Sequence, residues 1–292
     1  MLSPISNHFN FSVDNFGATW SDAGFGTSIP ANASANVKGA NTQVLTGIAE
    51  DCYAILISFV GSNASATIHR HLADLLIDPA AGVGGAGSAW SVVIANLYSA
   101  YPSLGCGGYC YYFPLYLKAG TAIGFAQQAV VAAKAMRVGV KLFGKPTRPE
   151  LLRVGTKVQT YGAVTASTSG TAITPGTNAM GAYTASLGTS TFDQFWWQGG
   201  LGFNDTTIGG GTSISETTFL DVAASNDGGT AKLICAENIA ATFSTTEQGG
   251  KEPFGSVPPV QRVPSGADVY MRGVSTIAPN TTPTCVAYGL GG

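Results

Sequence analysis

Short runs in which valine, threonine, tyrosine and phenylalanine alternate with polar residues recur along the whole chain. Examples are RVGVKLFG (137–144), KVQTYGAVT (157–165) and DVYMRGVS (268–275). Alternation with a period of two is typical of β-strands that bury one face. Gly, Pro, Asn and Asp interrupt these runs every eight to twelve residues or so, which is the spacing found in β-sandwiches and barrels. The pattern predicts an all-β protein.

One segment resembles a helix. TAIGFAQQAVVAAKAM (121–136) is rich in alanine and has a high helix propensity. Its counterpart later in the chain, 268–284, contains two prolines and many Thr and Val residues, which a helix interior does not tolerate. Because duplicated domains share a backbone, we expect both segments to be strand–loop–strand.

Segment 121–136 has a counterpart because the sequence contains an internal repeat. Gly17 and Gly120 are 103 residues apart, and Gly162 and Gly266 are 104 apart. Similar words recur at an offset near 145, such as GTSIP and GTAITP, or LADLLIDPA and FLDVAASND. An offset of this length has the size of a whole domain. We predict two tandem, duplicated, jelly-roll-like β-sandwich domains, at 1–145 and 158–292.

A charged segment, 146–157, joins the two predicted domains. Pro146 and Pro149 stiffen it, so that it should be an ordered linker. A freely solvated tether would need no apolar side chains, yet this one has three; we expect them to pack into the inter-domain seam. They are Leu151, Leu152 and Val154. Three charged side chains, Arg148, Glu150 and Arg153, should reach solvent or a neighbouring subunit.

Composition limits the function. Charged residues are only 10% of the 292 residues, against roughly 25% in soluble proteins, and the net charge is −2. Without a basic stripe, nucleic-acid binding through phosphate contacts is not expected. A surface with so few charges suits a permanent assembly, so we predict an obligate homo-oligomer. No signal peptide or membrane span is visible, which predicts a protein made in a host cytoplasm and not inserted in a membrane.

Candidate metal and thiol chemistry is sparse. His69 and His71 are two residues apart in a predicted strand, but no third ligand is nearby, so surface-facing histidines are favoured over a metal pair. CGGYC places Cys106 and Cys110 close enough for a local disulfide, although an intracellular origin favours free thiols. Cys52, Cys235 and Cys285 are interpreted as small buried residues. We predict no metal and no cofactor.

Catalytic motifs are also absent. The chain has no nucleophile elbow, zinc-protease helix or phosphate-binding loop. A glycosidase needs two carboxylates across a cleft, and the candidates lie in no recognisable motif. These are Asp74, Asp78, Glu150 and Asp205. We therefore predict that the protein is not an enzyme.

Aromatic residues gather in GYCYYFPLY (108–116) and FDQFWWQGG (192–200). Such rings can anchor a protein interface or stack on sugar faces. The candidate interface or glycan-contact residues are Tyr109, Tyr111, Tyr112, Trp196 and Trp197. Since Trp196 and Trp197 are adjacent, a strand would direct one ring inward and the other outward.

Tandem β-domains rich in Gly, Ala and Thr, the hinge FGKPTRPELLRVGTKVQTYGA (143–163) and the scarcity of charge together resemble structural proteins of tailed-bacteriophage virions. The resemblance implies sandwich domains that assemble symmetrically on a capsid or tail, as a head decoration or as part of a fibre or tip. A carbohydrate-binding module that contacts host-surface glycans is the alternative, and a secreted β-sandwich hydrolase is a weaker one.

Overall fold

The computed structural model describes residues 9–10, 12–16, 24–61, 69–101, 109–147, 153–162, 165–166, 170–203, 216–226, 233–243, 262–275 and 283–292. These residues form strands, turns and loops, with no helix among them, so the prediction of an all-β fold is confirmed. Accordingly, no described segment is a helix of the length and apolarity that a membrane span requires.

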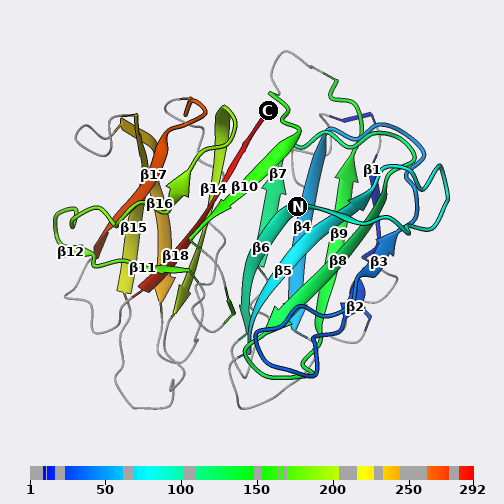
Figure 1. The fold of residues 1–292 in the computed structure, drawn as a ribbon, viewed down its shortest axis with the longest axis horizontal. Helices are drawn as coiled ribbons and strands as arrows, with labels where there is room; N and C mark the ends of the chain where they lie inside the picture. Colours follow the sequence, from blue (N-terminus) through cyan, green and yellow to red (C-terminus); the bar gives the residue numbers. More distant parts are fainter. Residues whose placement is uncertain are drawn as a thin grey trace.

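Strands β1 to β9 build a first sandwich of two sheets (Figure 1). Their bounds are Ser12–Asp14, Thr27–Ile29, Thr42–Leu45, Ala54–Gly61, His69–Asp78, Ser91–Tyr101, Tyr109–Phe113, Ala122–Ala129 and Met136–Phe143. One sheet has the order β1-β9-β4-β7, with β2 also paired to β9. The other has the order β3-β8-β5-β6. All these pairs are antiparallel, as in a sandwich built from hairpins and Greek keys.

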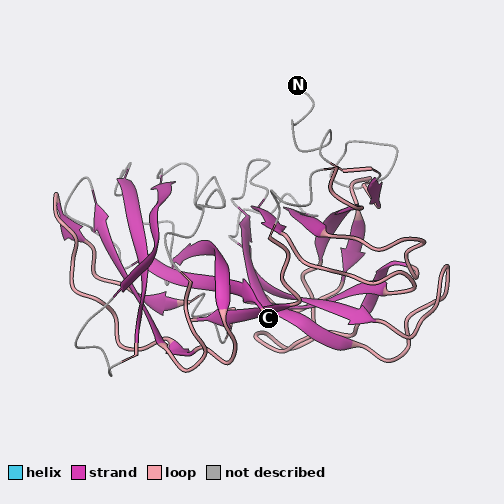
Figure 2. Cartoon of the chain, turned by 90° about the horizontal axis from the view of Figure 1, so that it is seen from above, coloured by secondary structure: helices cyan, strands magenta, loops and turns pink. Residues whose placement is uncertain are grey.

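Strands β10 to β18 build a second sandwich beside the first (Figure 2). Their bounds are Lys157–Tyr161, Thr171–Ala172, Gly176–Thr177, Gly188–Thr189, Gln194–Phe203, Glu216–Ser225, Leu233–Phe243, Asp268–Ser275 and Pro283–Gly291. One sheet has the order β10-β18-β11, with β14 also paired to β18. The other has the order β12-β17-β15-β16, with β13 also paired to β17.

The two sandwiches use corresponding strand orders. In each, two short early strands pair with the last strand, β1 and β2 with β9, and β10 and β11 with β18. Gly120 and Gly266 occupy matching turns before β8 and β17, at φ values of 85° and 88° that favour glycine. Their N–H groups donate to the carbonyls of Ile48 and Ser190, at 2.8 Å in both cases. A duplication would produce this correspondence; the common origin of the halves stays a prediction.

The alanine-rich segment is strand–loop–strand, as expected. Strand β8 covers 122–129 and β9 begins at Met136, with a turn between them in which Ala133 has a φ of 57°. Every residue of β8 is buried, because the strand lies between β3 and β5 inside its sheet. Small apolar residues suit a strand covered on both faces, so tertiary packing overrides the local helix propensity.

Buried side chains form two hydrophobic clusters, and the clusters do not divide at the domain boundary. The second contains residues of the second sandwich alone. The first contains the core of the first sandwich together with five residues of the second half of the chain. Those five are Ala166, Phe195, Val286, Tyr288 and Leu290. The first core therefore continues into the seam between the sandwiches.

Candidate functional site at the inter-domain seam

Strand β18 is buried on both of its faces, and this feature creates the seam. Val286, Tyr288 and Leu290 point toward the first sandwich and belong to its core cluster. Ala287 points the other way and belongs to the core of the second sandwich. Alternate residues of a strand point to opposite faces, so a continuous apolar run such as CVAYGL is what a doubly covered strand requires.

Tyr288 is the central side chain of the seam. Its ring packs edge-on against Tyr111 and Phe113, with centroid distances of 5.5 and 6.1 Å. Its hydroxyl accepts from the backbone N–H of Tyr98 and donates to the carbonyl of Asn96, each at 2.9 Å. Burial raises the pKa of Tyr288 far above its usual value, so the hydroxyl stays protonated and keeps its donor role.

A second set of contacts covers the edge of β7. The backbone N–H of Tyr112 donates to Oε1 of the buried Gln198 at 3.1 Å, and the Tyr112 ring meets Trp196 at 6.2 Å. Burial raises the pKa of Tyr112 to about 12. An open strand edge invites pairing with other chains, and here the second sandwich occupies it. On the other sheet, strand β6 is covered in the same way by β10 and β14.

The seam accounts for most of the predicted aromatic site. Tyr111, Tyr112 and Trp196 join the sandwiches to each other, so the interface that they anchor lies within one chain. Trp197 is 1% exposed and stacks on Tyr161 at 5.7 Å in the second core, so the adjacent tryptophans do point to opposite faces. Fully buried rings such as Tyr111 and Trp197 cannot stack on a sugar. The side chain of Tyr109 lies outside the described residues.

The described part of the linker is anchored to the first sandwich. Gly155 forms an isolated parallel β-bridge with Leu115. Its carbonyl accepts from the N–H of Tyr116 at 2.8 Å, and its N–H donates to the carbonyl of Pro114 at 2.9 Å. Arg153 is exposed, with its guanidinium 3.9 Å from the centre of the Phe195 ring. Val154 is half-buried. The other predicted linker contacts, of Arg148, Glu150, Leu151 and Leu152, lie outside the described residues.

The expectation of surface-facing histidines is wrong for His71. This side chain is 1% exposed, and its Nδ1 lies 2.7 Å from Oε1 of Gln127. Gln127 uses its Nε2 to donate to the carbonyls of Ile29 and Lys134, both at 2.9 Å, so its Oε1 is the acceptor and His71 carries the proton on Nδ1. The polar pair is buried within the first sandwich, which strand alternation alone could not reveal. The side chain of His69 lies outside the described residues.

The candidate carboxylates that the structure describes have structural partners. Asp78 is buried and accepts from the N–H groups of Ala80, Ser88 and Ala89 at 3.0, 2.7 and 2.8 Å. These backbone hydrogen bonds hold the pKa of Asp78 below its usual value. Asp74 forms an ion pair of 2.6 Å with Lys38. Glu150 and Asp205 lie outside the described residues.

Thiols and metals add no further chemistry to the described residues. Cys52 is a free, buried thiol, and burial raises its pKa to about 12. Cys110 is also free and accepts from the Ser58 hydroxyl at 3.5 Å, whereas Cys106 is not described. The side chains of Cys235 and Cys285 are likewise not described. Within the described ranges, no three His, Cys, Asp or Glu side chains gather to hold a metal.

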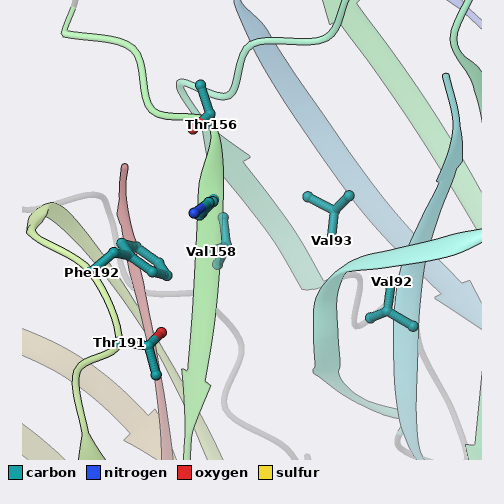
Figure 3. Close-up of a pocket in the computed structure, with 7 residues that line it drawn as sticks. Val92, Val93, Thr156, Val158, Thr191 and Phe192 are labelled. Atoms are coloured by element: carbon teal, nitrogen blue, oxygen red, sulfur yellow. The ribbon is translucent and has the colours of Figure 1, made fainter.

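A groove of about 370 Å³ opens where the two sandwiches meet (Figure 3). Its walls come from the start of β6, the start of β10 and the loop before β14. The lining residues are Val92, Val93, Thr156, Lys157, Val158, Thr191 and Phe192. Val92 and Val93 lie on one side of β10 in Figure 3, and Thr191 and Phe192 on the other. Sequence reasoning missed this groove, since β6 and β10 are far apart in the chain and neither carries a motif.

No protein-family model and no curated protein sequence matches the chain. Solved structures match it at low similarity. A structure of PNGF-II matches with a TM-score of 0.41 and 8% identity, covering 91% of this chain and 65% of that one. The chain thus spans less than two thirds of that protein.

Two further matches are of other kinds. The tandem CBM22-1-CBM22-2 domains of Paenibacillus barcinonensis Xyn10C match with a TM-score of 0.27 and 7% identity, over 96% of this chain and 91% of that one. Naturally occurring empty particles of cowpea mosaic virus contain a chain that matches with a TM-score of 0.29 and 12% identity, over 90% and 87%. All three scores describe a weak resemblance among β-folds, and none carries an argument about function.

Proposed function

We propose that the chain is a non-enzymatic structural subunit of a bacteriophage virion, which assembles as a homo-oligomer on the head or tail. The observation that carries the proposal is strand β18, whose two faces belong to two cores. Domains joined by a small polar interface usually move relative to each other, whereas a large apolar interface holds them fixed. A two-domain block of fixed shape is what a shell, collar or fibre needs from its repeating unit.

The hydrogen bonds and ion pairs of the acidic residues support a structural role. Asp51 accepts from the Tyr116 hydroxyl at 3.1 Å and from the N–H of Ala119 at 2.8 Å. Asp193 accepts from the N–H of Ser265 and pairs with Arg262. Asp221 pairs with Arg272 at 3.0 Å. Carboxylates that tie loops and strands together in this way are not poised for acid–base work, so the proposal includes no catalytic role.

The described surface indicates what contacts between copies would be like. Only four large hydrophobic side chains of the described residues are exposed, namely Val13, Val37, Val83 and Val92. The chain also has few charges and many Gly, Ser and Thr residues. We therefore expect the contacts between subunits to be more polar than the apolar interfaces that permanent oligomers usually have.

The proposal is tested by assembly. The purified full chain at micromolar concentration, measured by light scattering and negative-stain electron microscopy, should form a closed ring, trimer or lattice. In virions purified from an infected culture, mass spectrometry should find the chain in stoichiometric copy number. A stable, soluble monomer that is absent from the particles would contradict the proposal.

A further inference from the structure

The seam groove is an unusual part of the described surface, because an apolar side chain is left exposed inside a concave site. Val92 is 55% exposed and contributes to the groove wall beside Val93 and Val158. The other exposed valines, at 13, 37 and 83, are not part of it. Small-ligand sites have volumes of roughly 300–1,000 Å³, and the groove lies within that range. Its walls combine apolar side chains with an almost equal share of polar ones, which suits a ligand that has both apolar and polar faces.

The polar groups of the groove are two hydroxyls and one ammonium. Thr156 and Thr191 contribute the hydroxyls, and Lys157 contributes the ammonium, whose Nζ lies 6.0 Å from the centre of the half-buried Phe192 ring. Within the described ranges, Lys157 forms no ion pair with a carboxylate. A cation held beside an aromatic face without a counter-charge is free to meet an anionic ligand.

Two guanidinium groups lie close to Asp193, the residue that follows Phe192 of the groove wall. Arg153 lies over Phe195, and Arg262 pairs with Asp193. Both guanidinium groups lower the pKa of Asp193, after the larger effect of its hydrogen bond from the N–H of Ser265. Two cations thus accompany the carboxylate of Asp193, and Lys157 in the groove wall adds a third positive charge close in sequence to Arg153. The local field favours an anion.

We propose that the seam groove binds a sugar that carries a carboxylate. The apolar face of a pyranose ring packs on Phe192 and Val158, a contact that aromatic and aliphatic side chains make well. Sugar hydroxyls exchange hydrogen bonds with Thr156 and Thr191, and the carboxylate pairs with Lys157. A nucleic acid fits less well, because it needs several phosphate contacts along a stripe, and this groove holds a single lysine. The inference goes beyond the structural role proposed above and does not depend on it.

The test uses the full chain and calorimetric titration at low salt. Two carboxylated probes, trigalacturonate and sialyllactose, are compared with the neutral sugars maltotriose and lactose. A carboxylated probe should bind at least ten times more tightly than its neutral counterpart. Lys157→Gln should weaken that binding at least tenfold, and raising the salt concentration should weaken it as well. Lys118→Gln, a change at an exposed lysine outside the groove, should leave it unchanged.

A second pair of variants tests the location. Val92→Glu places a negative charge in the groove and should abolish binding, whereas Val83→Glu, at a site 66% exposed and outside the groove, should have no effect. Because the backbone of Gly292 lies against Lys157, the titration is repeated on a chain with a short neutral C-terminal extension. Both exposed-valine variants should assemble as the wild type does, which separates this test from the test of the structural role.

Three results would overturn the proposal. The first is that neither carboxylated probe binds. The second is that binding persists unchanged in both Lys157→Gln and Val92→Glu. The third is that the oligonucleotide dT6 binds in the groove more tightly than either sugar, which would assign the site to nucleic acid instead.

Discussion

Asp74 and Asp221 occupy the same position in the two sandwiches. Asp74 lies opposite Ala126 in the pairing of β5 with β8, and Asp221 lies opposite Arg272 in the pairing of β15 with β17. A register shift in the pairing with the next strand, β6 or β16, flanks each carboxylate. Only the cation differs, since Asp74 pairs with Lys38 from a loop and Asp221 with Arg272 from the neighbouring strand. The two halves thus keep a charge pair at one position with different partners, partly buried in the first sandwich and with a buried carboxylate in the second.

Replacing Asp74 by Asn removes the charge but keeps an acceptor for the N–H of Asn96, which donates to Asp74 at 2.7 Å. The free energy of unfolding should fall by about 2 kcal/mol at pH 7, the range for a hydrogen bond to a charged group. Burial lowers the pKa of Lys38, and Asp74 opposes that effect. Without Asp74 the folded-state pKa of Lys38 falls further. At pH values above that pKa, the unfolded state then binds more protons than the folded state, so the variant gains stability as the pH rises. The loss should therefore shrink as the pH rises from 7 to 10 in urea titrations.

Asp221→Asn is the matched control for this pH dependence. Its cation is an arginine, a residue type that keeps its charge in proteins, so the destabilisation of this variant should not change between pH 7 and 10. If the destabilisation of both variants decreased equally at high pH, the Lys38 ammonium would not be the source of the pH dependence.

Tyr288→Phe should lower the free energy of unfolding by about 1–3 kcal/mol, because the Asn96 carbonyl and the Tyr98 N–H lose their buried partner. Tyr53→Phe is the control, since the Tyr53 ring packs on Tyr116 and its hydroxyl forms no hydrogen bond within the described ranges. Chemical denaturation measures both. A Tyr288→Phe variant as stable as the control would mean that the hydroxyl does not hold the seam.

The wild-type chain should unfold in one cooperative step, since the first hydrophobic cluster includes residues of both sandwiches. Val286→Asp places a charge in the seam and leaves the second core intact, because Val286 and Ala287 point to opposite faces of β18. Calorimetry should then resolve two transitions. A single transition in the variant, at an unchanged midpoint, would contradict a shared core.

Asp78→Ala should open the loop between β5 and β6. The carboxylate satisfies the N–H groups of Ala80, Ser88 and Ala89, and these amides should exchange with solvent much faster in the variant. In the wild type the pKa of Asp78 is lowered, so its contribution is present above about pH 4 and is lost as the pH falls through the lower folded-state pKa. Protection of the three amides that persists unchanged in the variant would contradict this role.

Trypsin should not cleave the native chain after Arg153. The guanidinium lies over Phe195, and Gly155 is hydrogen-bonded to the segment around Leu115, so cleavage requires local unfolding. Mass spectrometry of the digest identifies the cut sites. Rapid cleavage there, before any cut within the strands, would identify the linker as a flexible tether.

Sequence patterns were sufficient for the strand content, because alternation and turn residues act locally. They also predicted that 121–136 is not a helix, through comparison with 268–284. These contacts of the seam could not be predicted from the sequence, because the hydrogen bond between the Tyr98 N–H and the Tyr288 hydroxyl joins residues 190 positions apart. His71 was misassigned for a related reason. Whether a polar strand residue faces solvent or a buried partner such as Gln127 depends on distant segments that cover it.

Strand β18 has a consequence for synthesis of the protein on the ribosome. The first sandwich can complete its own sheets once β9 has emerged. Its edges at β6 and β7 are covered by β10 and β14, and these two strands are held in their sheet by β18, which is complete only about 150 residues after β9. At roughly 5–20 residues per second, that interval lasts roughly 7–30 s. During it the half-made chain presents two open strand edges and the rings of Tyr111 and Phe113. The nascent chain is therefore most prone to associate wrongly with other nascent chains shortly before its last strand is synthesised.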